Sequence, residues 1–305
     1  AMEEGGRADT AKRPCPAPPL AARPQSLSVT EVETLIRDPY AIYAKKVLGL
    51  RPIEELVRDP GAAERGSLFH AIFEHVVIEK VDPLALDALE RTLAIARSLF
   101  DAENLPPDIR AVWWPRIEAG VAGIVAWEAE RAGAVAERFA EIEADRTEVV
   151  PTGVALTGRA DRMDRRRDGT IDIVDFKTGA PPTAKMVKAL FAPQLPLEGA
   201  LLARGAFSKI GEAGVAGMAY VQVGSKGSVT ERNVLKGDKT AGDIDPAEIS
   251  EAAWEKLSEM LAWYGSETNG YLSQRMPQKL RGRLGDYDHL ARVHEWRSGG
   301  GDGDE

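Results

Sequence analysis

One stretch, Leu156–Gly179 (LTGRADRMDRRRDGTIDIVDFKTG), constrains the fold of this chain more than any other. It predicts two β-strands joined at Asp168-Gly169, because Asp-Gly is a favoured dipeptide in tight hairpin turns. Folding the chain back there brings Asp161 within about one residue of the position opposite Asp175. Cross-strand neighbours on one face have Cβ atoms about 5 Å apart, so one divalent cation could bridge the two carboxylates.

The second predicted strand carries Ile173, Asp175 and Lys177 on one side, because successive side chains point to opposite faces of a strand. Two charged groups at the end of an apolar run are not the pattern of a solvated strand edge. Each charged residue taken singly also fits a structural role: an ion pair with a neighbouring arginine for Asp161, a cap of the following turn for Asp175, and a snorkelling side chain for Lys177. Their combination favours a functional site.

Together, Asp161 and Asp175-Phe176-Lys177 match a D…(D/E)-x-K pattern, and the stretch resembles the active site of the PD-(D/E)xK nucleases. The strings GRADR and DFKTG look like the RecB-type branch, whose signatures are a Gly-x-x-Asp-Arg strand and an Asp-x-Lys-Thr strand. The resemblance implies an α/β (α+β mixed) fold with a restriction-endonuclease-like core. In that fold a central mixed sheet is flanked by helices, here with a helical insertion.

A helix is predicted over about residues 61–80, where His70 and Glu74 share one face because they are four residues apart. A lone histidine on a helix is more often a structural residue than a ligand. However, the spacing Gly66-x-x-x-His70-x-x-x-Glu74 resembles the first motif of RecB-type nucleases, in which that histidine binds the metal. Glu74 would then support the ligands without touching the metal.

A further helix is predicted in PQLPLEGALLARG, which contains Gln194 as its second residue. One glutamine means little alone, but at this distance after Asp-x-Lys it resembles the Gln-Leu motif of the family. There the glutamine helps to position DNA or water beside the metal. Many relatives carry a tyrosine in the next turn, where this chain has Glu198, so no tyrosine role is carried over.

The resemblance implies a bound Mg²⁺, for which Mn²⁺ may substitute, because such ions lower the pKa of an attacking water and polarise a phosphate. The implied metal ligands are His70, Asp161, Asp175 and the backbone carbonyl of Phe176. Lys177 would orient the attacking water and stabilise developing charge, and Gln194 would assist positioning. Basic residues of the turn and of a later segment could contact phosphates or simply be solvated. These are Arg162, Arg165, Arg166, Arg167, Lys279, Arg281 and Arg283.

Composition excludes several classes of protein and site. The net charge of −9 argues against a surface that is basic throughout, although a local basic groove is compatible with it. Cys15 is the single cysteine, so neither an internal disulfide nor an iron–sulfur cluster is expected. The sequence has no apolar run of about eighteen residues, so no membrane span is expected and the predicted location is cytoplasmic and nucleoid-associated.

The predicted organisation is one nuclease domain between two disordered ends. Breaks in the helical part are expected near Pro106-Pro107 and at Trp113–Pro115, and a last helix is expected over Asp286–Trp296. The predicted segments are a disordered leader or linker over 1–26, a domain over 27–297 and a disordered tail over 298–305. Within the domain they are a helical part over about 27–140, a catalytic core over about 141–235 and C-terminal helices over 246–297.

In its closest form, the resemblance is to the nuclease domain at the C-terminal end of AddB subunits of the α-proteobacterial type. It implies a Mg²⁺-dependent deoxyribonuclease, an exonuclease within a helicase–nuclease that resects double-strand breaks for recombinational repair. The implied partners are single-stranded DNA, an AddA-like subunit and the remainder of an AddB chain. Two alternatives are a free-standing RecB- or Cas4-like exonuclease and a catalytically silent module of the same fold that guides DNA or docks subunits.

Overall fold

The computed structural model describes residues 11–52, 61–224, 226–237, 242–276 and 285–298. The chain divides into two compact units. The smaller unit comprises Ala1–Glu54, Val149–Val154 and Leu257–Glu305, and the larger comprises Glu55–Glu148 and Ala155–Lys256. Every candidate ligand and catalytic residue lies in the larger unit.

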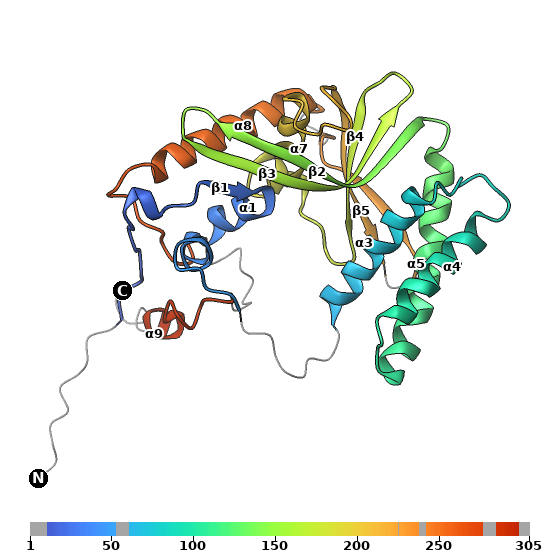
Figure 1. Cartoon of the computed structure of the whole chain (residues 1–305), viewed down its shortest axis with the longest axis horizontal. Helices are drawn as coiled ribbons and strands as arrows, with labels where there is room; N and C mark the ends of the chain where they lie inside the picture. Colours follow the sequence, from blue (N-terminus) through green and yellow to red (C-terminus); the bar gives the residue numbers. More distant parts are fainter. Residues whose placement is uncertain (1–10, 53–60, 225, 238–241, 277–284, 299–305) are drawn as a thin grey trace, which may run out of the picture. The chain divides into compact units, whose positions relative to one another are not determined.

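The larger unit contains a mixed sheet and several helices (Figure 1). Its helices are α3 (Ala62–Ile78), α4 (Ala88–Ala102), α5 (Pro107–Arg131), α6 (Ala184–Lys188), α7 (Gln194–Ala203) and the first part of α8 (Pro246–Tyr264). Its strands include most of β2 (Val135–Val149) and β3 (Val154–Arg166), and all of β4 (Ile171–Lys177), β5 (Val215–Val223) and β6 (Val229–Asn233). β3 pairs with β2 and antiparallel to β4, β4 lies parallel to β5, and β5 lies antiparallel to β6. The predicted mixed sheet flanked by helices is confirmed.

The hairpin of β3 and β4 forms as predicted. Asp168 accepts hydrogen bonds from the backbone and side chain of Thr170, and Gly169 has a φ of +88°, which glycine adopts without steric cost. The last paired residues before the open end are Arg162 and Val174. Continuing this antiparallel register by one residue places Asp161 opposite Asp175.

Helices cover both faces of the two central strands. Phe176 points into the apolar core formed with α3, α4 and α5, whereas Asp175 points to the opposite face, where α7 contacts β4 and β5. Figure 1 shows α4 and α5 side by side at one end of this unit. The buried side chains of the α3–α5 core include Leu68, Phe69, Ile72, Phe73, Phe100, Trp113, Ile117, Val121, Ile124, Trp127, Val174, Val221 and Val223.

The predicted break at Trp113–Pro115 is wrong, because α5 continues through Pro115. A proline inside a helix costs about 3 kcal/mol, since it removes one backbone hydrogen bond and crowds the preceding turn. Burial of Trp113, Ile117 and their neighbours on the same helix outweighs that cost. The other break, at Pro106-Pro107, is confirmed, because α5 begins at Pro107.

The smaller unit holds short elements and the rest of α8. They are a 3₁₀ turn at Leu20–Ala22, β1 (Ser26–Ser28), α1 (Val29–Arg37), α2 (Pro39–Ile42), a π-helical turn at Tyr43–Val47 and α9 (Val293–Ser298). A capping box between Ser28 and Glu31 starts α1.

Two expectations for the smaller unit need correction. The carbonyls of Pro14 and Pro16 accept backbone hydrogen bonds from Ser273 and Tyr271, which is not the arrangement of a disordered leader over 11–26. The last helix is shorter than predicted, because turns occupy the chain up to Arg292 and α9 begins only at Val293. Lys279, Arg281, Arg283, residues 1–10 and 299–305 lie outside the described residues. Among the described helices, each is too short or too polar to cross a lipid bilayer.

Candidate metal centre

His70 lies on α3 with oxygen atoms near both of its ring nitrogens. Nε2 is 3.1 Å from the backbone carbonyl oxygen of Phe176, and Nδ1 is 3.4 Å from Asp161 Oδ2 and 3.5 Å from Glu141 Oε1. The backbone N–H of Phe176 also donates to Asp161 Oδ2 over 3.1 Å. Strands β2, β3 and β4 therefore each bring one oxygen-bearing group to the imidazole that α3 supplies.

Gly66 explains how α3 comes this close to the end of β4. A Cβ atom at Gly66 would lie 3.3 Å from Thr178 Oγ1, which is tighter than nearly all real Cβ contacts. Glycine four residues before His70 thus gives α3 more room beside Thr178, the residue that follows β4.

Glu141 is a site residue that the sequence analysis missed. It lies within β2 with a φ of +46°, in the left-handed region that non-glycine residues rarely adopt and that costs about 1–3 kcal/mol. Its side chain is only 9% exposed and reaches both His70 and Arg159, whose Nε lies 2.8 Å from Glu141 Oε2. Strained backbone that aims a carboxylate at a histidine is typical of functional sites.

Three of these side chains could hold a metal ion. His70, Glu141 and Asp161 each offer one ligand atom, and these atoms lie within 4.8 Å of one another. The donors are one imidazole and two carboxylates, a set that suits Mg²⁺ or Mn²⁺. Asp175, which the sequence analysis assigned as a ligand, is not a member of this group.

Asp175 is instead held by Lys177 and Gln194. Lys177 Nζ lies 2.5 Å from Asp175 Oδ2, and Gln194 Nε2 donates to Asp175 Oδ1 over 2.7 Å. The same amide nitrogen donates to Glu198 Oε1 over 3.2 Å. Asp175 and Glu198 are each 1% exposed, so two carboxyl groups share a buried region with one lysine.

The electrostatics around His70 favour a positive charge. Burial lowers the pKa of His70, but hydrogen bonds to Asp161 and Glu141 outweigh it and raise that pKa to about 10. Burial would raise the pKa of Asp161, but the hydrogen bond and charge of His70, with the charge of Lys177, lower it. The surrounding oxygens thus favour a cation here, which a proton or a metal ion can supply.

The electrostatics around Asp175 show a shortage of positive charge. Burial and the charge of Asp161 raise the pKa of Asp175 to about 7, against the opposing effect of Lys177. Burial, followed by the charges of Asp175 and Asp161, raises the pKa of Glu198 well above its usual range. Burial lowers the pKa of Lys177, but the charge of Asp175 reverses this and raises it. A divalent cation would relieve this shortage.

A cavity of about 530 Å³ gives access to the group from solvent. Glu74 lies in its wall, and a supporting role for Glu74 stays a prediction. The lining residues are Ala63, Gly66, Ser67, His70, Ala71, Glu74, Glu141, Arg159, Asp161 and Thr178.

The predicted phosphate contact by Arg162 is wrong. Arg162 is 1% exposed, forms an ion pair with Asp164 and lies 2.8 Å from Glu128 Oε1, so a phosphate cannot reach it. Arg166 pairs with Asp172, Arg165 lies 3.3 Å from Glu137, and Arg167 donates to the carbonyl of Gly133. These arginines of β3 and of the following turn mainly hold the hairpin to neighbouring elements.

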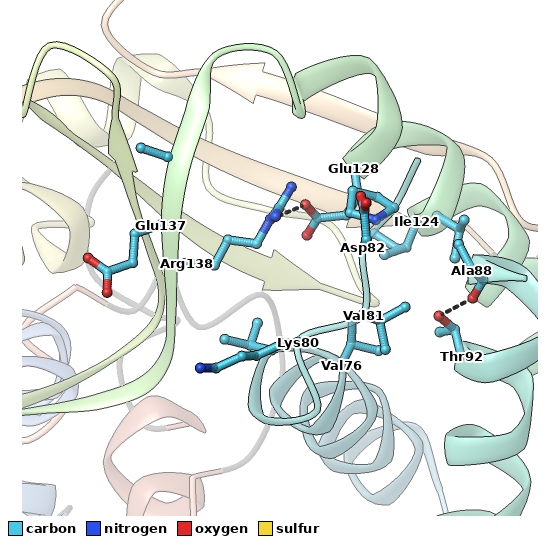
Figure 2. A pocket seen from close by; sticks show the side chains of 14 residues that line it. Val76, Lys80, Val81, Asp82, Ala88, Thr92, Ile124, Glu128, Glu137 and Arg138 are labelled. Atoms are coloured by element: carbon cyan, nitrogen blue, oxygen red, sulfur yellow. Dashed lines mark hydrogen bonds and ion pairs between the residues drawn. The ribbon is translucent and has the colours of Figure 1, made fainter. Parts of the chain in front are cut away.

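Glu128 links this ion-pair network to a second cavity, of about 400 Å³ (Figure 2). Figure 2 shows Arg138 of β2 reaching Glu128 of α5, over a distance of 3.0 Å. Four valines and Ile124 line much of this cavity, and both charge signs are present in Lys80, Asp82 and Glu137. Apolar residues thus make up more of its lining than of the lining of the cavity at the candidate metal centre.

Comparison with known proteins agrees with this geometry. A family model described as the PD-(D/E)XK nuclease superfamily matches residues 26–279. An uncharacterized protein of Rickettsia conorii is 30% identical over 191 residues, which are 61% of this chain and 23% of that protein. An uncharacterized protein of Rickettsia felis is 26% identical over 226 residues, which are 72% of this chain and 26% of that protein. The chain thus spans about a quarter of the length of these curated relatives.

A solved structure, the crystal structure of SSO0001, matches 78% of this chain and 76% of its own. The two sequences are 15% identical and the TM-score is 0.30. A similarity this low identifies no equivalent site residues.

Proposed function

The chain belongs to the PD-(D/E)XK nuclease superfamily, and we propose from this premise that it is a Mg²⁺-dependent deoxyribonuclease that hydrolyses phosphodiester bonds. One observation carries the proposal: His70 lies against both Asp161 and the carbonyl of Phe176. Lys177 lies next to Asp175 on the adjoining side. One substrate phosphate could therefore contact both a metal ion held beside His70 and the ammonium of Lys177.

His70, Asp161, Asp175 and the carbonyl of Phe176 would hold the ion, and Glu141 would join them. One imidazole with several oxygen donors fits Mg²⁺ or Mn²⁺, and the raised pKa of Asp175, caused by burial and by the charge of Asp161, reflects its need for a further cation. When bound, the ion polarises the phosphate as a Lewis acid and lowers the pKa of water.

Lys177 and Gln194 have separate roles in the proposed reaction. The ammonium of Lys177 stabilises the negative charge that develops on the phosphate oxygens and orients the attacking water. Gln194 holds the carboxylate of Asp175 in place by donating to it. A bond forms between the water oxygen and phosphorus while the bond to the 3′ oxygen breaks. The attacking water releases one proton to solvent, and the departing 3′ oxygen takes up one proton from solvent.

We further propose that the chain is the nuclease domain of an AddAB-type helicase–nuclease, an exonuclease acting on single-stranded DNA in double-strand break repair. The proposal is supported by the residues of the motifs GRADR, DFKTG and PQLPLEGA, by their order along the chain, and by the superfamily match over residues 26–279. The partners would be an AddA-like subunit and the remainder of an AddB chain, in the cytoplasm at the nucleoid.

The test is cleavage of end-labelled single-stranded DNA in Mg²⁺ by the wild type and by Lys177→Met. We expect Lys177→Met to lower the cleavage rate by about 10²- to 10³-fold, the usual loss when one group that stabilises developing charge is removed. Lys185→Met, at an exposed position on α6, is the matched control and should cleave like the wild type.

A parallel calorimetric titration with Mn²⁺ separates the proposal from a catalytically silent module. Lys177→Met should bind Mn²⁺ as the wild type does, because Lys177 is not a ligand. A wild type that neither binds Mn²⁺ nor cleaves DNA in Mg²⁺ or Mn²⁺ would favour the DNA-guiding or subunit-docking function.

A further inference from the structure

Arg159 lies at the candidate metal centre without being buried in it. It precedes Asp161 by two residues on β3, so both side chains lie on one face of the strand. Its side chain is 62% exposed and lines the same cavity of about 530 Å³ as His70, Glu141 and Asp161. An exposed guanidinium therefore lies in the cavity through which solvent reaches the candidate metal ligands.

Glu141 fixes the inner edge of this guanidinium. Arg159 Nε lies 2.8 Å from Glu141 Oε2. Within the described residues, Glu141 is the ion-pair partner of Arg159. A guanidinium has five N–H donors in a rigid plane, and Nε supplies only one of them. The terminal amino groups keep four donors in a geometry that fits two oxygens of one phosphate.

The positive charge of Arg159 matters for binding a polyanion because several acidic residues line the same cavity. Glu74, Glu141 and Asp161 line it and would repel a polyanion. Of the described residues that line this cavity, Arg159 alone carries a permanent positive charge. A DNA strand entering the cavity would meet that charge as well as any bound metal ion.

We propose that Arg159 binds the phosphate next to the scissile phosphate on the same DNA strand, and that Glu141 holds the guanidinium in place. This inference rests on the proposed nuclease function and specifies its substrate. Because the contact is to a second phosphate, Arg159 favours polynucleotides over small phosphodiesters that contain one phosphate. It takes the place of Arg162 as a residue that contacts the strand.

The first experiment compares two substrates for the variant Arg159→Gln. Cleavage of single-stranded DNA should show a KM raised by about 10-fold, the value of one hydrogen-bonded charge, with kcat little changed. Hydrolysis of bis(p-nitrophenyl) phosphate in Mn²⁺ should proceed as in the wild type, because this substrate has a single phosphate. Arg116→Gln, at an exposed arginine of α5 that lines neither cavity, is the control.

The second experiment measures binding of single-stranded DNA in Ca²⁺ at several salt concentrations. Arg159→Gln should make the slope of log affinity against log salt shallower by about 0.7, the value for one lost phosphate contact on a single strand. Arg159→Lys keeps the charge and should keep most of the slope. Neither variant should alter Mn²⁺ affinity measured by calorimetry without DNA.

Distinct outcomes separate this inference from the proposed function. If Arg159→Gln weakens Mn²⁺ binding while the salt slope stays that of the wild type, Arg159 only positions Glu141 and the inference is overturned. Equal losses on DNA and on the small diester would overturn it too. A wild type that neither binds nor cleaves DNA overturns the proposed function itself.

Discussion

Two buried aspartates on one hairpin, Asp164 of β3 and Asp175 of β4, have opposite electrostatic surroundings. They are 0% and 1% exposed. Burial would raise the pKa of Asp164, but Arg162 and Arg131 outweigh it and lower that pKa. At Asp175, burial and the charge of Asp161 raise the pKa to about 7, and Lys177 does not compensate.

The charged groups around Asp164 and those around Asp175 differ in the same way as the two pKa values. Around Asp164 the acidic and basic groups neutralise one another: the network comprises Glu128, Arg131, Arg138, Arg162, Arg166 and Asp172. Around Asp175, the carboxyl groups of Asp161 and Glu198 lie near Lys177 and His70, and Glu141 adds a further carboxyl group beside His70 and Asp161. A buried carboxylate with matched counter-charges stabilises a fold, whereas one without them is suited to bind a cation.

Substituting each aspartate by asparagine gives the largest expected contrast. Asp164→Asn should lower the free energy of unfolding by about 3–5 kcal/mol, because it leaves the buried charge of Arg162 short of a partner. Asp175→Asn should not lower the free energy of unfolding at pH 7, because it removes a buried carboxylate whose pKa is raised to about 7. It should lower DNA cleavage by about 100-fold, the upper end of the loss when a group that supports a metal ligand is removed. Urea unfolding and a cleavage assay measure the two effects.

The reverse pattern would refute the distinction between the two carboxylates. If Asp175→Asn unfolded the protein while Asp164→Asn folded normally but lost cleavage, Asp164 would be the functional group. Asp164→Asn should keep its specific activity under conditions in which it is folded, since Asp164 contacts arginines and not the ligands.

The pH dependence of stability in metal-free buffer should have opposite signs for the two aspartates. Asp175 has a folded pKa of about 7, above the value of about 3.9 in an unfolded chain, so its stabilising effect is present below about pH 4 and lost as pH rises to 7. Asp164 has a lowered pKa, so its effect is present above about pH 4 and lost as pH falls further. Urea unfolding from pH 3 to 8 should therefore show a decline between pH 4 and 7 that Asp175→Asn lacks.

Added Mn²⁺ provides the control for this pH effect. At pH 7.5 an ion at 100 times its dissociation constant should stabilise the wild type by about 2.7 kcal/mol by mass action. His70→Ala should reduce this gain, because His70 contributes a ligand atom to the group. Equal declines in the wild type and Asp175→Asn would show that Asp175 is not the group that titrates.

Local sequence patterns were sufficient to predict the hairpin and the positions of its two site aspartates. The Asp168-Gly169 turn fixes the register, and the register alone places Asp161 opposite Asp175. Helix α7 (Gln194–Ala203) also forms within the segment in which a helix was predicted from its apolar pattern. These features depend on residues close together in the chain, so one sequence contains the information.

The residues that sequence analysis misassigned depend on distant partners. Arg162 was one of several arginines before the turn, and its burial follows from Glu128, 34 residues earlier on α5. Glu141 lies in a segment with several other acidic residues, and only its left-handed backbone turns its carboxylate toward His70. Neither long-range pairing nor a single unusual φ angle leaves a sequence signature.

Glu198 provides the smallest and most specific test of the contrast, because it is a second buried carboxyl group and forms no ion pair within the part of the chain that the structure describes. It lies one helical turn after Gln194 and accepts one of the two N–H donors of that side chain, the other being given to Asp175. Glu198→Leu should lower kcat for DNA by about 5-fold, since one unsatisfied N–H costs about 1 kcal/mol and loosens Gln194. Glu198→Gln keeps an acceptor oxygen and should cleave almost as the wild type does. A loss near 100-fold in both variants would mean that Glu198 acts on the substrate directly and not through Gln194.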